Sequence, residues 1–179
     1  MRKRLKIWGA ALCLCLGAAP VLDAGASAGH ADRGPGTGTF AVSGTGGGTL
    51  ELPRYEGDIV SFRVRASAPS DAAWTATGSF DVTHVRPDGT VLADFSGTVD
   101  CLMVGAGVAV VTGIITKGGA AGIPGEELGR RVGLTVSDHG RRDHLGWSWL
   151  VTGFHDVTPC TSTAPFFPVT EGNFSVDAR

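Results

Sequence analysis

The amino-acid sequence predicts an all-β fold: a single-domain antiparallel β-barrel, with a β-sandwich as the alternative, behind an N-terminal signal helix. From Asp58 onward, apolar and polar residues alternate with a period of two, which is typical of strands with one buried face. Gly, Pro and Asp turns separate these runs, and after the leader no window of about ten residues keeps a helical period free of Gly or Pro. A sheet of many strands must close or stack to protect its edges, and near-sequential hairpins favour a barrel.

The first 28 residues have the layout of a secretory signal peptide. Met1–Lys6 is basic, Ile7–Leu22 is mostly apolar, and small-x-small cleavage sites end at Ala26 and Ala28. The apolar stretch is shorter than the roughly 20 residues that a membrane-spanning helix needs, so we expect cleavage and no membrane span afterwards. An uncleaved anchor is the alternative. The expected localisation is secreted and extracellular.

Cleavage changes the charge of the chain and its cysteine content. The leader removes four of the 15 Lys/Arg and one of the 17 Asp/Glu, which leaves 11 against 16 and a net charge of −5. An acidic chain without a basic stripe disfavours a nucleic-acid partner. Cys13 and Cys15 leave with the signal, and in an oxidising compartment we expect Cys101 and Cys160 to form a disulfide. Two buried free thiols are the alternative.

The next elements are read in chain order. Residues 29–48 are predicted to be a flexible Gly-rich segment, with a short strand at Thr39–Ser43 and a mobile loop at Gly44–Gly48. The barrel domain is expected to span residues 49–179. Within it, Ile59–Ala68 alternates aliphatic residues with arginines and serine, which predicts a half-buried antiparallel strand.

Three consecutive strands form a predicted meander. The first ends at Arg86, and Pro87-Asp88-Gly89-Thr90 has the composition of a turn. A two-residue loop at Asp88-Gly89 pairs His84 with Ala93 and Val82 with Phe95. The second strand covers residues 91–104 and the third covers 108–116. A three-residue loop at 105–107 then sets Met103 against Ala109, Cys101 against Val111 and Val99 against Gly113. The inward positions under this register are Phe80, Val82, His84, Val91, Ala93, Phe95, Val99, Cys101 and Met103.

The remaining third of the chain continues the pattern. Residues 117–125 are predicted to be a loop, 126–130 could form one helical turn, and 131–138 alternates as a strand. Leu145–Thr152 is predicted as a strand with Trp147 and Trp149 facing inward and Ser148 exposed. Asn173–Asp177 is expected to be a short closing strand.

Several strand and turn motifs give the chain a resemblance to known proteins. The runs are Gly78–His84, Pro87–Gly89, Phe95–Leu102, Ala109–Gly113 and Val136–Gly140. Together they resemble an uncharacterised group of secreted actinobacterial proteins, and the resemblance covers roughly residues 75–177. It implies a small calycin-like β-barrel. The group has no known activity, so the resemblance implies none for this chain.

The candidate ligand-binding residues are His84, Phe80, Phe95 and Trp149. His84 is predicted to face inward beside Phe80, where an imidazole can meet a ligand or instead form a hydrogen bond within the core. A binding barrel predicts an interior void lined by Phe80, Val82, Phe95, Met103 and Trp149.

Other polar motifs give little support to a catalytic or metal site. Two aspartates and two histidines in this stretch could ligate a divalent metal: Asp138, His139, Asp143 and His144. However, the positive charges of Arg141 and Arg142 repel a metal cation, and the spacing of the four residues fits no common metal site. A solvated loop is the simpler interpretation. No catalytic residue, metal or cofactor is predicted.

The sequence therefore favours a secreted, soluble, non-enzymatic β-barrel that binds a small apolar ligand or a cell-envelope component. Two other classes stay open. One is a barrel-scaffold enzyme, hydrolytic or cyclase-like, in which His84 and Asp138 are the first residues to test. The other is a structural or surface-interaction protein that uses its Gly-rich arm as a tether. The sequence predicts no oligomeric state.

Overall fold

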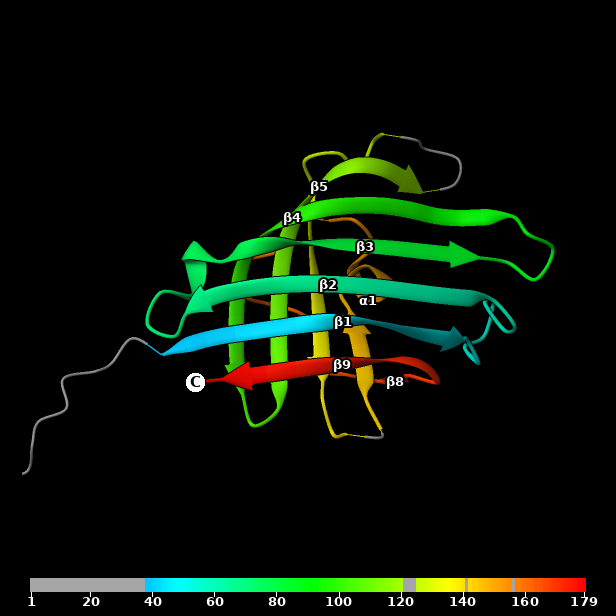
Figure 1. Ribbon diagram of the computed structural model, residues 1–179. Helices are drawn as coiled ribbons and strands as arrows, with labels where there is room; N and C mark the ends of the chain where they lie inside the picture. The colour runs from blue at the N-terminus through cyan, green and yellow to red at the C-terminus, as the bar shows by residue number, and fades with distance from the viewer. Residues whose placement is uncertain (1–37, 121–124, 141, 156) are drawn as a thin grey trace, which may run out of the picture. The chain divides into compact units, whose positions relative to one another are not determined.

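The computed structural model describes residues 38–120, 125–140, 142–155 and 157–179, and these fold as one all-β unit (Figure 1). The all-β prediction is confirmed. The predicted signal helix over residues 1–28, and the Gly-rich segment as far as residue 37, lie outside the described residues.

Nine strands make a single antiparallel sheet in the order β8-β7-β6-β5-β4-β3-β2-β1-β9. Strands that are adjacent along the chain are mostly adjacent in the sheet, as expected for hairpin connections. β9 is the exception, because it returns to pair with β1. The strands are β1 (Thr39–Thr49), β2 (Ile59–Pro69), β3 (Thr77–Val85), β4 (Val91–Gly105), β5 (Val108–Ala120), β6 (Arg131–Ser137), β7 (His144–Trp147), β8 (Phe167–Pro168) and β9 (Glu171–Ala178). Two short helical segments, η1 (Ala73–Thr75) and α1 (Trp149–Thr152), complete the described elements.

The sheet curls into a half-barrel because β4 and β5 bend sharply. Figure 1 shows β1, β2, β3 and β9 running across the front while parts of β4 and β5 descend behind them beside β6 and β7. The register between β4 and β5 shifts at Ser96/Gly97 and again between Val99 and Cys101. Such bulges bend a strand and increase its twist. The bend gives the sheet a concave face, and the core fills it.

Aromatic rings fill most of this concave face. The largest side chains that are fully buried include Phe62, Phe80, Phe95 and Phe174. The Phe80 ring lies over the backbone at the bend: a Cβ atom on Gly113 would come within 2.7 Å of its Cε1 atom. Glycine is required there because the Phe80 ring and the Thr98 carbonyl oxygen occupy the space of a side chain.

The predicted mobile loop at Gly44–Gly48 is wrong. The strand expected at Thr39–Ser43 is present, but β1 continues through the glycines to Thr49 and pairs with β2 on one side and β9 on the other. Two neighbouring strands supply the hydrogen bonds that compensate the backbone entropy of the glycines. A Cβ on Gly46 would come within 2.6 Å of the Phe174 ring, so the glycines also make room for the core.

The first predicted hairpin is confirmed and the second is shifted. His84 pairs with Ala93 and Val82 with Phe95, as expected. At the second hairpin the loop is only Ala106-Gly107, both with positive φ, which is the geometry of a type I′ turn.

The second hairpin therefore has a different register near its turn. Met103 faces Val110 and Cys101 faces Thr112, although Val99 still faces Gly113. The bulge between Val99 and Cys101 reverses the facing of the residues beyond it, so Met103 is 50% exposed and Leu102 is fully buried. Val91, also predicted inward, is 50% exposed beyond the register shift at His84/Val85.

The predicted strand over residues 145–152 is only half correct. β7 ends at Trp147, and α1 places Trp149 on a helical turn that ends at Gly153 with φ 63°. Ser148, predicted to be exposed, is buried because its Oγ accepts a hydrogen bond from the Gly133 amide at 2.9 Å. β5 also extends to Ala120, into the predicted loop.

The closing strand expected near the C-terminus is confirmed as β9. Its free edge is capped by side chains rather than by another strand. Asp143 Oδ2 accepts from the Phe174 amide at 2.8 Å, and Asp138 Oδ2 accepts from the Val176 amide at 3.1 Å. These carboxylates link the β6–β7 connection to β9. Neither helical segment in the described part of the chain has the length and hydropathy that crossing a membrane requires.

Candidate functional site

The connection between β1 and β2 is a compact loop that carries Arg54, Tyr55 and Asp58, besides the exposed Glu51 and Glu56. Its ends are tied by hydrogen bonds from the Leu50 amide to the Asp58 carbonyl and from the Gly57 amide to the Leu50 carbonyl, at 2.7 and 2.9 Å. The Asp58 amide also donates to the Tyr55 carbonyl at 3.0 Å. These bonds fix the positions of Arg54, Tyr55 and Asp58 at one end of the half-barrel.

The β3–β4 hairpin lies at the same end and contributes Arg86. The Arg86 amide donates to the Thr90 carbonyl at 2.8 Å, and Asp88 Oδ1 accepts from the Thr90 amide at 2.9 Å. The hydrogen bonds from Thr90, its backbone amide first, hold the pKa of the exposed Asp88 carboxyl below its usual value. The nearby positive charge of Arg86 adds a smaller lowering of the same pKa, so Asp88 stays ionised in the turn.

α1 and Phe154, two residues after its end, add aromatic side chains to the same region. Trp149 and Phe154 are stacked with ring centroids 6.1 Å apart, and Trp149 meets Phe95 edge-on at 5.3 Å. Trp147 packs against Phe62 at 4.9 Å. The rings form a continuous aromatic layer from the core outward.

These three parts, together with residues of the neighbouring strands, line a partly open pocket of about 370 Å³. Its volume is within the range of small-molecule sites, which are mostly apolar with a few placed polar groups. The larger apolar lining side chains are Leu50, Val60, Phe62, Val82, Leu92, Trp147, Trp149, Leu150 and Phe154. The polar lining side chains are Arg54, Tyr55, His84 and Arg86.

A buried carboxylate orients the imidazole in this pocket. His84 Nε2 and Asp58 Oδ2 are 2.7 Å apart, and the two side chains are 17% and 5% exposed. When the carboxylate is ionised it only accepts hydrogen bonds; Nε2 is then the donor, and a neutral imidazole keeps Nδ1 as an acceptor. Tyr55 packs edge-on against the same ring at 5.4 Å between centroids. An imidazole held in this way can accept a hydrogen bond from a ligand or a proton from a substrate.

The structure brings only part of the predicted site together. His84 and Trp149 line the pocket, as does Val82 from the predicted void. Phe80 and Phe95 are buried in the packed core behind the pocket, and Met103 lies on the outer surface. The void lies between the loops and α1, toward one end of the sheet.

Sequence reasoning missed Asp58, although a signal was present. Asp58 lies directly before β2, in phase with the inward-facing Val60 and Phe62, and Val60 is the residue that pairs with His84. A carboxylate at an inward position beside an inward histidine predicts an interacting pair. Arg54, Arg86 and Phe154 gave no comparable signal, since their positions depend on loop conformations.

The polar cluster at residues 138–144 has a structural role in addition to being partly solvated. Asp143, expected in a solvated loop, is 4% exposed, because it caps β9 together with Asp138. Its Oδ1 atom has no hydrogen-bond partner in the described part of the chain. Over those same residues, no three His, Cys, Asp or Glu side chains come together as a metal site.

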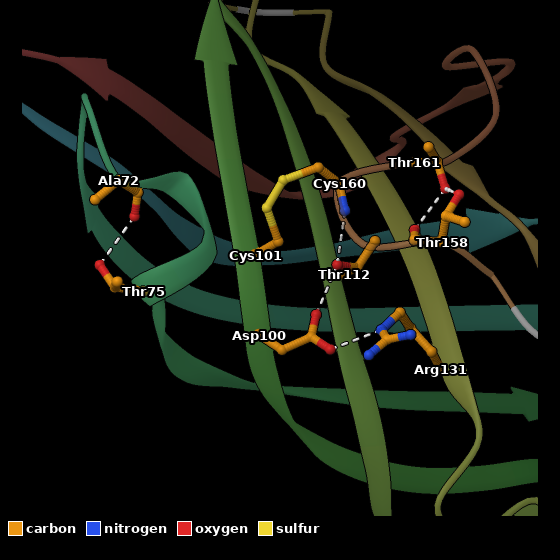
Figure 2. The surroundings of a disulfide bond; sticks show 9 residues. All are labelled: Ala72, Thr75, Asp100, Cys101, Thr112, Arg131, Thr158, Cys160 and Thr161. Carbon is orange, nitrogen blue, oxygen red and sulfur yellow. Dashed lines mark hydrogen bonds and ion pairs between the residues drawn. A yellow bond between two sulfur atoms is a disulfide. The ribbon is translucent and has the colours of Figure 1, made fainter.

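The predicted disulfide between Cys101 and Cys160 is present, with Cα atoms 5.3 Å apart (Figure 2). It fastens the segment after α1 to β4. Figure 2 shows the polar network beside it: Asp100 accepts from Thr112 Oγ1 and from Arg131 Nε, each at 2.7 Å. Thr112 Oγ1 in turn accepts from the Cys160 amide at 3.1 Å. This region lies among residues distinct from those that line the pocket, and its role is structural.

No protein-family model, curated protein or solved structure matches this chain. The chemistry of the pocket is therefore the basis for a functional assignment.

Proposed function

We propose that this chain is an exported protein whose pocket binds a small apolar ligand, either a free molecule or a component of the cell envelope. The pocket of about 370 Å³ carries the proposal, because apolar and aromatic side chains make up most of its lining. The signal-peptide layout, the disulfide and the resemblance to secreted actinobacterial proteins support export.

The first experiment looks for a ligand that is already bound. Protein purified without detergent from the culture medium is measured by native mass spectrometry, and we expect an additional mass that disappears on denaturation. Recovery of the protein only from cells, with the leader intact, would contradict export.

A pocket-filling variant locates the binding site. Ala120→Leu adds apolar volume to the pocket lining, and Ala178→Leu makes the same change at an exposed position on β9. With 1-dodecanol as a neutral apolar probe, we expect calorimetric binding to the native chain and to Ala178→Leu, and weaker binding to Ala120→Leu. Equal binding by all three proteins would place the probe elsewhere.

An enzyme is the second candidate, and the 2.7 Å contact between His84 and Asp58 favours it. A carboxylate-oriented imidazole beside an apolar pocket is the arrangement of a general base. A short-chain p-nitrophenyl ester tests hydrolysis. If the chain is a hydrolase, His84→Gln and Asp58→Asn both lower the rate, and His139→Gln, at an exposed position, does not. If the ester is hydrolysed no faster than in buffer alone and the protein binds dodecanol, the result favours a binding protein over an enzyme.

A further inference from the structure

We propose that the ligand is an amphipathic molecule with an acidic head group, and that Arg54 and Arg86 hold this head group at the mouth of the pocket. The inference rests on the proposed binding function and names the chemical class of its ligand. It is carried by the sign of the charges around the pocket, by the way the two loops are held together, and by the conformation of Arg54.

All permanent charges on the described lining are positive. Arg54 and Arg86 line the pocket, and none of the described lining residues is an aspartate or glutamate. Neither arginine takes part in any of the ion pairs formed within the described segments. Asp58 is turned to His84, and Asp88 is bonded to Thr90 in the exposed turn beside Arg86. Two exposed arginines therefore line an apolar pocket in a chain whose net charge is −2.

The two arginines belong to loops that touch. A Cβ atom on Gly57 would lie 3.2 Å from Pro87 Cγ, so the β1–β2 loop packs directly against the β3–β4 turn. Both loops are closed by backbone hydrogen bonds. Arg54 and Arg86 are thus presented together rather than on independent mobile segments, and such preorganisation lowers the entropic cost of binding.

Arg54 adopts a conformation that arginine rarely takes. Its φ of 76° is in the left-handed region, which is unfavourable for a residue with a Cβ. Non-glycine residues in such conformations cluster at ligand sites. The left-handed conformation here belongs to a residue that lines the pocket.

The remaining lining suits the other end of an amphiphile. Among the lining residues, Phe62 is buried and Trp149 and Phe154 are half-buried, whereas both arginines are exposed. An apolar tail can therefore be buried against the aromatic rings while its head group stays near solvent. A guanidinium matches a carboxylate with two parallel hydrogen bonds, which favours an acid over an alcohol of the same length.

Three amphiphiles with the same tail test the proposal: dodecanoate and dodecyltrimethylammonium, each below its micellar concentration, and 1-dodecanol below its solubility limit. Binding is measured by calorimetry and by tryptophan fluorescence, to which Trp147 and Trp149 contribute from the pocket. We expect dodecanoate to bind roughly three- to tenfold more tightly than dodecanol, as two partly exposed charge contacts allow, and the ammonium to bind most weakly. Salt at about 1 M, where the Debye length is about 3 Å, should reduce the preference for the acid.

Arginine variants test whether Arg54 and Arg86 cause the preference for dodecanoate over dodecanol. Arg54→Gln and Arg86→Gln should each weaken dodecanoate binding several-fold and leave dodecanol binding unchanged. Arg65→Gln, on the exposed face of β2, is the matched control and should alter neither. If dodecanol or the ammonium binds as tightly as dodecanoate, the assignment of an acidic head group is wrong while the binding function stands. If no amphiphile binds, both the binding function and this inference are wrong.

Discussion

Asp143 and Asp138 act at the free edge of β9, where they take the place of backbone carbonyls. An edge strand leaves alternate amides without a partner, and burying an unpaired amide costs about as much as a lost hydrogen bond. Phe174 is 1% exposed, so its amide cannot rely on water, and Asp143 Oδ2 supplies the acceptor at 2.8 Å. The two aspartates of the predicted solvated loop therefore complete the sheet.

We expect Asp143→Ala to lower the free energy of unfolding by about 1–3 kcal/mol, because the Phe174 amide is left buried without an acceptor. Urea denaturation followed by tryptophan fluorescence measures the change. Asp94→Ala, at an exposed position on β4, is the control and should alter stability by less than about 0.5 kcal/mol. Equal stabilities for the two variants would show that the Asp143 carboxylate is not needed at the edge.

β4 is the element that decides the curvature of the sheet. Its two register shifts place the bend beside Gly97, and Gly113 faces Val99 on the adjoining strand β5. The Phe80 ring fills the space beside both glycines, with its Cε1 atom 2.7 Å from the position of a Cβ on either one. Bulges, glycines and one phenylalanine together form the corner of the half-barrel.

Gly113→Ala should destabilise the protein by roughly 1–3 kcal/mol, since the added methyl group clashes with the Thr98 carbonyl oxygen and with the Phe80 ring at the packed corner. Gly105→Ala is the matched control: it lies at the other end of the hairpin, where a Cβ would meet nothing within 4 Å. Thermal or urea denaturation of both variants provides the test. Wild-type stability in Gly113→Ala would mean that the corner can repack around the added methyl group.

The sequence was sufficient for elements that depend on local pattern. The alternation in β2, β3 and β6 and the turn at Pro87–Thr90 predicted strands and a register that the structure confirms. It was insufficient where tertiary contacts override local preference. The Gly44–Gly48 run becomes a strand because it lies between two others, and a helical turn starts at Trp149 because Ser148 turns inward to bond Gly133.

The candidate site was only partly predictable for the same reason. The register of one hairpin placed His84 correctly on the inward face. The pocket itself depends on the β1–β2 loop, the β3–β4 turn and α1 meeting at one end of the sheet. The alternation of apolar and polar residues predicts single strands but not which loops come together. Phe80 and Phe95 were inward as expected, but inward positions near the middle of the sheet are filled by packing.

At the scale of the whole molecule, a long segment after α1 covers the outer face of β6. Thr135 and Ser137, on the face that simple alternation would expose, are buried, and Thr135 Oγ1 donates to the Thr163 carbonyl at 2.6 Å. The segment has little regular structure of its own, so its attachment depends on specific fastenings. The disulfide at Cys160 and the bond from Arg131 Nη1 to the Val157 carbonyl at 3.2 Å are two of them.

Removing the disulfide tests how strongly the covering segment depends on it. The bridge joins residues 59 positions apart, and in the chain-entropy model such a loop contributes about 4 kcal/mol to stability. We therefore expect the double variant Cys101→Ala/Cys160→Ala to unfold at a lower urea concentration. Reducing agent should destabilise the native chain and leave the double variant unchanged.

Hydrogen exchange on the double variant then separates a local effect from a global one. The double variant keeps the hydrogen bonds from Arg131 to Val157 and from Cys160 to Thr112 that hold the segment after α1. If these bonds are enough to hold the segment, the β6 amides stay protected from exchange although the global stability falls. If the segment detaches, the amides of residues 133–137 exchange faster than those of β2, and Thr135 and Ser137 become accessible to solvent. Unchanged urea midpoints and unchanged exchange would contradict a stabilising role for the bridge.

Because the residues that line the pocket differ from those that form the disulfide, the folded fraction of the double variant should still bind dodecanol.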